Sequence, residues 1–179
     1  MELVDLLLSS KENLLAASQI AISVYKAKSK IVNKLFDSIK SKLDKDNIKY
    51  IEDNNKSLIG INIPFLKKRE CGISVDTYIR IEIDQYLYIG YCCTSNGLNN
   101  KELITPSEVV KYINPTYHCK LDHTSWWIYK EFILDENNED TFEFKNFNTN
   151  AYKLLDDKYL DSLCNRGVIK IKEMLEKKC

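Results

Sequence analysis

Arginine, net charge and long apolar runs are scarce in this sequence, and each scarcity argues against a class of function. Only Arg69, Arg80 and Arg166 stand among 26 basic residues, so few guanidinium groups are present to grip phosphate or carboxylate. The 26 basic and 26 acidic residues cancel. Binding a nucleic-acid backbone needs a positive surface and mimicking one needs a dense negative surface, so neutrality argues against both roles.

Several enzyme motifs and membrane segments are also missing. The chain has no G-x-G-x-x-G, no Walker loop and no G-x-S-x-G, so nothing predicts a nucleotide cradle or a hydrolase elbow. No apolar run approaches the roughly 18 residues that span a bilayer. No signal-peptide pattern opens the sequence. We therefore expect a cytoplasmic protein without a membrane role.

The cysteines do not have the paired spacing of a zinc ribbon; they stand at positions 71, 92, 93, 119, 164 and 179. Cys92 and Cys93 are neighbours, which point to opposite faces of a strand. Cys119 with His118 or His123 is the other candidate for zinc binding or nucleophilic catalysis, but it lacks the C-x2-C or H-x3-H pairs typical of tetrahedral zinc sites. We expect reduced thiols, no bound metal and no cofactor.

The overall composition is that of a globular protein, with 44% hydrophobic and 29% charged residues. No internal repeat, low-complexity tract or linker divides the chain. These features predict a single domain over residues 1–179, with a helical N-terminal segment at 1–46 and an α+β body at 50–179.

Residues 9–44 are predicted to form a long helix or a kinked pair of helices. Ser9 and Glu12 fit a capping box, and apolar residues then recur at steps of three and four. The apolar stripe consists of Ile20, Val24, Ala27, Ile31, Leu35, Ile39 and Leu43. The opposite face carries Lys26, Lys30, Lys34, Asp37 and Lys40. The simpler interpretation is that this charged face is exposed to solvent. The alternative is that the helix binds a partner.

Alternation with a period of two predicts strands between Tyr50 and Cys93. Residues 58–65, closed by Pro64, are expected at a sheet edge because proline cannot donate to the ladder. In the next strand the isoleucines at 79, 81 and 83 alternate with polar residues, so Glu82 and Asp84 are expected to face water. A further strand continues to Cys93.

The second half of the chain mixes helices and strands. Thr105-Pro106-Ser107-Glu108 predicts the start of a short helix through Ile113 that stops before Asn114-Pro115. Residues 126–134 and 141–147 predict a hairpin, and the stripe from Leu160 to Leu175 predicts a final helix. The expected fold class is α+β: a long N-terminal helix or helix pair, an antiparallel sheet of about five strands, and a short middle helix and a C-terminal helix packed on the sheet.

Glu143 and Lys145 have the spacing of a two-metal nuclease, in which a carboxylate and a lysine two residues apart share one strand face. Asp140, Asp135 or Asp122 would supply the upstream acid. The phenylalanines of the same run would fill the buried face of a hairpin. Glu143 and Lys145 are then a charged pair on its wet face, the interpretation that we favour.

Aromatic residues gather around Trp126, Trp127 and Tyr129. Tryptophan and tyrosine are enriched at binding hot spots. Neighbours in a strand face opposite ways, so one tryptophan is expected in the core and the other toward solvent or a partner. We select Trp126, Trp127, Tyr129 and Tyr88 as candidate partner-binding residues; packing of both tryptophans in the core is the alternative.

Four landmarks resemble the C-terminal region of bacterial and phage proteins of the PD-(D/E)XK nuclease superfamily. They are Tyr86-Leu87-Tyr88-Ile89-Gly90-Tyr91, Trp126-Trp127 before a hairpin, Asn146-Phe147, and the closing run from Leu163 to Leu175. The resemblance covers residues 58–178. In that family the catalytic strands precede this region, whereas this chain begins with helices. The resemblance therefore implies a stand-alone accessory domain and transfers no catalytic residue.

The leading hypothesis is a non-enzymatic protein-interaction protein, encoded by a phage or mobile element, that binds and inhibits a host defence protein. It is motivated by the missing catalytic motifs, the long helix and the aromatic sheet. One alternative is a metal-dependent nuclease or its relic, resting on Glu143 and Lys145. The other is a structural homo-oligomer formed through the N-terminal helices.

Overall fold

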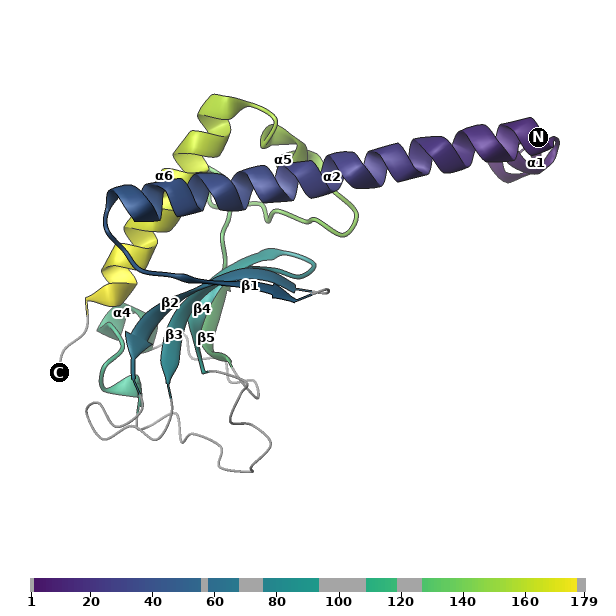
Figure 1. Cartoon of the computed structure of the whole chain (residues 1–179). Helices are drawn as coiled ribbons and strands as arrows, with labels where there is room; N and C mark the ends of the chain where they lie inside the picture. The colour runs from purple at the N-terminus through teal and green to yellow at the C-terminus, as the bar shows by residue number, and fades with distance from the viewer. Residues whose placement is uncertain (1, 56–57, 68–75, 94–108, 119–126, 177–179) are drawn as a thin grey trace, which may run out of the picture.

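A computed structural model describes residues 2–55, 58–67, 76–93, 109–118 and 127–176, and all structural statements below concern these. The helices are α1 (Leu3–Leu8), α2 (Lys11–Lys45), α4 (Pro115–His118), α5 (Thr149–Lys153) and α6 (Asp157–Leu175). The strands are β1 (Ile51–Asn55), β2 (Leu58–Leu66), β3 (Thr77–Ile83), β4 (Leu87–Cys93) and β5 (Trp127–Phe132). They form one antiparallel sheet in sequence order, and the predicted α+β layout is confirmed (Figure 1).

The N-terminal segment is a pair of helices. The Ser9 hydroxyl ends α1 by donating to the carbonyl of Leu6 at 2.7 Å. Ser10 begins α2, because its side chain accepts the backbone N–H of Asn13 at 3.1 Å. The cap is therefore one residue later than predicted. α2 continues for 35 residues, a length of roughly 50 Å.

The sheet is a meander in which β3 and β4 form the central hairpin. β2 lies inside the sheet and not at its edge, because β1 pairs along it with Ile51 opposite Asn62. Pro64 is tolerated because the β2–β3 ladder is irregular between Pro64 and Leu66. The edge prediction was wrong because the β1 segment, with Asp53 and Asn54, carries little of the usual strand composition.

The predicted strand at residues 141–147 does not form. Single bridges hold this segment, from Glu143 to Tyr86 and from Thr141 to Leu134. The backbone turns at Phe147, whose φ is 55°. The Phe144 ring then meets the Phe147 ring edge to face, with centroids 5.7 Å apart. The spacing of the phenylalanines reflects packing within a turn and not a strand period.

Helical structure in the middle of the chain ends close to the predicted stop, because Val109 and Val110 are helical and a turn follows them, and it resumes at Pro115. The predicted start at residues 105–108 lies outside the described residues. Pro115 opens α4, which suits a residue with a fixed φ and no N–H to lose. The Asn114 side chain accepts the backbone N–H of Thr116 at 3.0 Å. Asn114-Pro115 therefore marks a restart of helical structure as well as a break.

One hydrophobic core lies between the sheet and the helices α2 and α6. Leu35 of α2 and Ile79 of β3 are fully buried in it. Tyr91 of β4 donates to the carbonyl of Met174 in α6 at 2.7 Å. Burial of each large aliphatic side chain contributes about 1.5–3 kcal/mol, so this layer supplies most of the driving force for folding.

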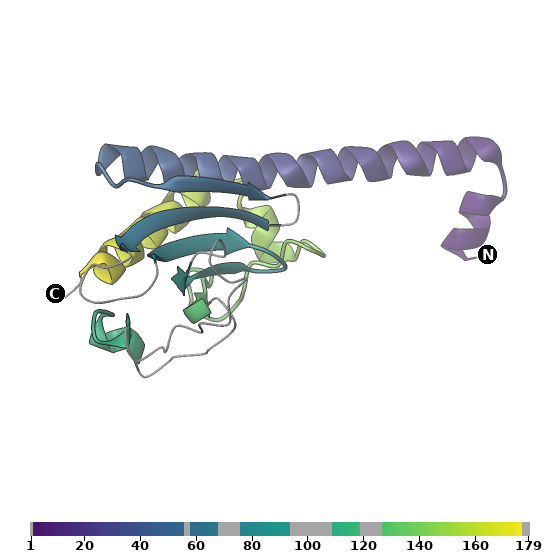
Figure 2. The same ribbon diagram turned by 60° about the horizontal axis from the view of Figure 1, so that its bottom comes forward.

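Only the second half of α2 belongs to this core. Its first buried residue is Ile31. The first half projects from the sheet and α6 as a free rod, with α1 at its tip (Figures 1 and 2). In Figure 2, α1 hangs from the rod on the side of α2 on which the sheet lies.

Candidate functional site

The sheet face turned away from the helices holds a buried charge network. The Arg80 guanidinium donates through Nε to Glu82 at 2.6 Å and through Nη1 to Asp53 and Asn62, each at 2.9 Å. Arg80 is 1% exposed and Glu82 is 4% exposed. The prediction that Glu82 faces water was therefore wrong, because the alternate face of β3 is buried too. Asp84, at the end of the strand, is exposed as predicted.

Gly60 makes room for this network. A Cβ at this position would lie 2.7 Å from the Cζ atom of Arg80. Burial is the largest influence on the Glu82 carboxyl and raises its pKa, while Arg80 acts in the opposite sense. Side chains of three strands hold the guanidinium. The role of Arg80 is therefore structural: it links β1, β2 and β3.

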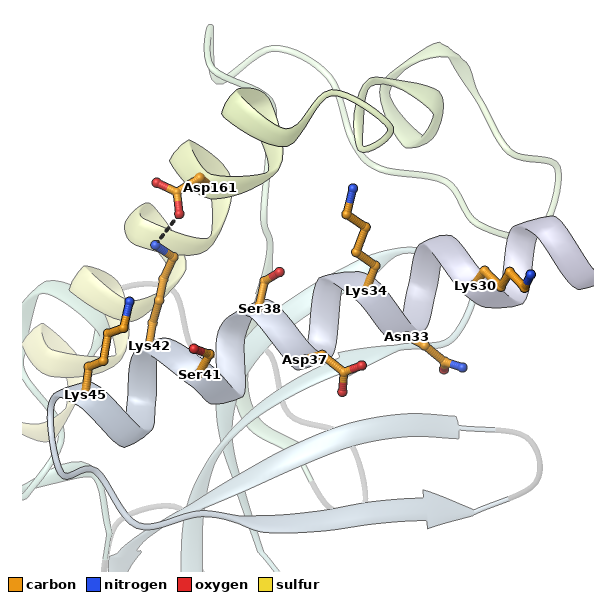
Figure 3. Close-up of a pocket in the computed structure, with 9 residues that line it drawn as sticks. All are labelled: Lys30, Asn33, Lys34, Asp37, Ser38, Ser41, Lys42, Lys45 and Asp161. Carbon is orange, nitrogen blue, oxygen red and sulfur yellow. Dashed lines mark hydrogen bonds and ion pairs between the residues drawn. The ribbon is translucent and has the colours of Figure 1, made fainter.

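A cleft of about 500 Å³ lies along α2 beside α6, lined by lysines and small polar residues (Figure 3). Two of its four lysines are engaged by acids of α6. Lys42 is bonded to Asp161 at 2.6 Å, as the dashed line in Figure 3 shows, and Lys34 is bonded to Asp157. Lys42 holds the pKa of Asp161 below its usual range. These pairs serve to hold α6 against α2.

The predicted partner-binding residues divide between the interior and the surface. Trp126 lies outside the described residues. Trp127 is 4% exposed and Tyr129 is fully buried, so both rings contribute packing and not contact surface. Tyr88 is partly exposed and stacks on Phe132 with centroids 5.0 Å apart. Sequence alternation could not show that both faces of β5 are covered.

Lys130 completes a small aromatic cluster at this edge of the sheet. Its ammonium lies 4.7 Å from the centre of the Tyr88 ring. Tyr86 meets Phe132 edge to face at 5.4 Å. These contacts tie β4 to β5 and leave Phe132 partly open to solvent. The cluster is a small surface feature of a few rings.

The residues of the nuclease hypothesis do not converge in the described parts of the chain. The Glu143 carboxylate accepts from Asn146 at 2.7 Å and from Gln85 at 3.2 Å. Lys145 and Asp140 are exposed. Within the described ranges, no group of three or more His, Cys, Asp or Glu side chains is placed to hold a metal ion. The hypothesis stays a prediction, tested by incubating DNA or RNA with the protein and Mg²⁺ or Mn²⁺.

Three thiols are buried, at Cys92, Cys93 and Cys164. Burial raises the pKa of Cys93 and of Cys164 to about 12, and it also raises the pKa of Cys92. The thiolate is the form that attacks electrophiles and binds metals. These thiols stay protonated, so they are poor nucleophiles and poor metal ligands. The predicted alternative at Cys119 and His123 lies outside the described residues, as does the His118 side chain.

Among the residues that the structure describes, most of the exposed large apolar side chains lie on the N-terminal rod. We call residues 3–27, which comprise α1 and the first half of α2, the arm. Of the 15 large hydrophobic residues that the described chain exposes, ten lie in the arm. They are Leu3, Val4, Leu6, Leu8, Leu14, Leu15, Ile20, Ile22, Val24 and Tyr25, with 44–73% of their surface open to solvent.

The arm also has an unusual distribution of charge. No charged residue occurs between Asn13 and Tyr25. Glu12 precedes this stretch and Lys26 follows it. The apolar stripe is continuous along α2, so the sequence pattern groups these residues with the buried half of the helix. The absence of charge over the stretch was the signal that could have separated the two halves.

A groove of about 620 Å³ lies where the arm leaves the sheet. Ala21, Val24 and Tyr25 line it from α2. Phe144 and Phe147 line it from the opposite side, together with Ile59 and Ile83 of the sheet. Lys28 spans the two sides, with its ammonium 5.0 Å from the centre of the Phe147 ring. The groove is lined mainly by apolar side chains, with Lys28, Asp84 and Lys145 also in its lining, and it is continuous with the arm.

No helix in the described part of the chain combines the length and the hydrophobicity that crossing a bilayer requires. By its architecture the molecule belongs to the α+β class, with a five-stranded antiparallel meander and a projecting N-terminal helix. Comparison with family models, curated proteins and solved structures found no match. The comparisons therefore lend no support to the resemblance to PD-(D/E)XK proteins.

Proposed function

We propose that this chain is a non-enzymatic protein-interaction protein and that the arm is its contact surface. The observation that supports the proposal is the group of ten large apolar side chains that the arm exposes. Contiguous apolar surface of this extent on a water-soluble domain marks an interaction site, because leaving it hydrated is costly. A helix with apolar residues around its circumference is normally buried against other structure.

Affinity capture tests the proposal. The tagged chain and a variant lacking residues 1–27 are exposed to lysate of the source cells. We expect the full chain to retain a protein in stoichiometric amount and the truncated variant to lose it. Retention by both forms, or recovery of neither another protein nor the untagged chain itself by the full chain, would contradict the proposed role of the arm. The narrower proposal of a phage-encoded inhibitor of a host defence protein is tested by the identity and activity of what is captured.

A further inference from the structure

We infer that the arm pairs with the arm of a second copy of this chain, in an antiparallel two-fold dimer centred at residue 19. The inference rests on the proposed function and names the partner. Its basis is the side of α2 that faces the sheet. Ala21, Val24 and Val32 all line the groove beside the sheet, so they share that side. Steps of three and four extend the same stripe outward from Ala21 through Ala17 to Leu14.

This stripe is complementary to itself when the second helix runs in the opposite direction. With the two-fold axis at residue 19, Leu14 of one copy lies opposite Val24 of the other. Ala17 then lies opposite Ala21, so small residues meet at the centre and large ones toward the ends. Alanine at the crossing lets two helix axes approach to roughly 8 Å, the close end of the packing range.

The arm's terminal charges lie outside this seam. Glu12 and Lys26 stand seven residues on either side of Gln19, so all three share the face of α2 opposite the stripe. The stripe itself is uncharged from Leu14 to Val24.

The position of the sheet and α6 excludes a parallel arrangement. The stripe that faces the second helix over the arm is covered by the chain's own sheet and α6 from Ile31 onward. A parallel partner would run into them. In the antiparallel pair Ser10 of one copy lies opposite Lys28 of the other, so the partner's α2 begins just where the covered part of the first copy ends.

The tip of the arm then reaches the groove of the other copy. α1 hangs on the same side of α2 as the sheet (Figure 2). It carries four exposed apolar residues, among them Leu3 and Leu8. The groove offers Phe144 and Phe147 on the opposite wall. The dimer therefore covers α1 and the groove together, twice by symmetry.

Each copy contributes one face of the arm to the seam, with α1 and the groove at its two ends. A membrane surface fits the arm less well, since an interfacial helix needs a strongly charged face. Between Asn13 and Tyr25 the arm has no charge on any face.

Two matched variants test the interface by light scattering and sedimentation velocity. We expect the wild-type chain to have twice the 20.9 kDa mass of one chain. Ala21→Glu puts a charge in the apolar seam and should weaken the dimer roughly 100-fold or more. Gln19→Glu adds the same charge two positions away, roughly 200° around the helix, and should leave the dimer intact. Circular dichroism verifies that both variants fold.

A monomeric wild-type chain at every concentration, or equal effects of Ala21→Glu and Gln19→Glu, would overturn the dimer. A monomer that captures a different protein through the arm refutes the dimer while the proposed function stands. A monomer that binds anionic phospholipid vesicles, with binding lost in Ala21→Glu, would assign the arm to a membrane surface and contradict both proposals.

Discussion

At the scale of single residues, Gly60 and Arg80 show how a missing side chain accommodates a buried charge. The Arg80 guanidinium lies over β2 where Gly60 has no Cβ, and it reaches Asp53 on the next strand. A buried charge that loses a partner is strongly destabilising. The position therefore demands glycine for steric reasons and not for backbone conformation.

We predict that Gly60→Ala lowers the free energy of unfolding by about 1–3 kcal/mol, because the added methyl group must displace a guanidinium that several bonds hold in place. Gly167→Ala is the matched control. Its added Cβ meets nothing within 4 Å and lies within α6, so it should stabilise the protein by up to about 1 kcal/mol. Urea unfolding measures both, and equal effects of the two substitutions would contradict the packing described at Gly60.

The buried cysteines give a second prediction at this scale. In a variant with Cys71, Cys119 and Cys179 replaced by serine, only the buried thiols remain. We expect negligible reaction with Ellman's reagent at about pH 8 in the native state, because burial keeps these thiols protonated. All three should react after unfolding in guanidinium. Fast labelling of the native variant would show that this part of the core opens.

At the scale of elements, α2 and α6 are joined by packing and by charge. Cys164 of α6 lies against the carbonyl of Leu35 in α2, with the sulfur 3.9 Å away. The ion pair between Lys42 and Asp161 spans the same seam at its solvent-facing edge. The apolar contacts set the position of α6 on α2, and the ion pair adds to the stability of this packing.

Asp161→Asn should therefore reduce stability at neutral pH by a modest amount. Lys42 lowers the folded-state pKa of Asp161. The contribution is consequently present above the ordinary carboxyl pKa and lost as the pH falls through the lowered value. Unfolding curves of both forms should differ near pH 7 and converge in acid. The neutral-pH difference should also shrink at about 1 M salt, where exposed pairs are screened; a difference independent of pH would refute the electrostatic origin.

At the scale of the whole molecule, the arm differs from the rest of the described chain because it contributes no residue to the hydrophobic core. The sheet, α6 and the second half of α2 share one core. The arm has no residue in it, since the first buried residue of α2 is Ile31. An isolated helical rod is marginal in water, which makes association the natural source of its stability.

Removal of residues 1–27 is therefore expected to leave the remainder folded, with an unfolding midpoint in urea close to that of the monomeric full-length Ala21→Glu variant. Deletion to residue 35 is the contrasting variant, because it removes Ile31, Val32 and Leu35 from the core. Loss of several buried aliphatic residues should abolish cooperative unfolding. Collapse of the shorter truncation would show that the arm is required for folding.

Local patterns in the sequence established most of the elements. Steps of three and four predicted the helical N-terminal segment and α6, and alternation predicted β3 and β4, because these periods depend only on backbone geometry. The same alternation failed at residues 141–147. There the aromatic side chains stabilise a turn, and a period of two is a poor guide when rings pack against each other locally.

The roles of individual residues depended on contacts between distant segments. The sequence determined that β3 has an apolar face, but only the fold decided that Glu82 is buried with Arg80, because strand pairing brings Asp53 and Asn62 to the same guanidinium. Likewise, the apolar stripe of α2 is a property of the sequence, whereas the boundary at Ile31 is a property of the structure. Hydrophobicity makes burial favourable, and the length of the sheet and α6 determines how much of the helix the chain itself can cover.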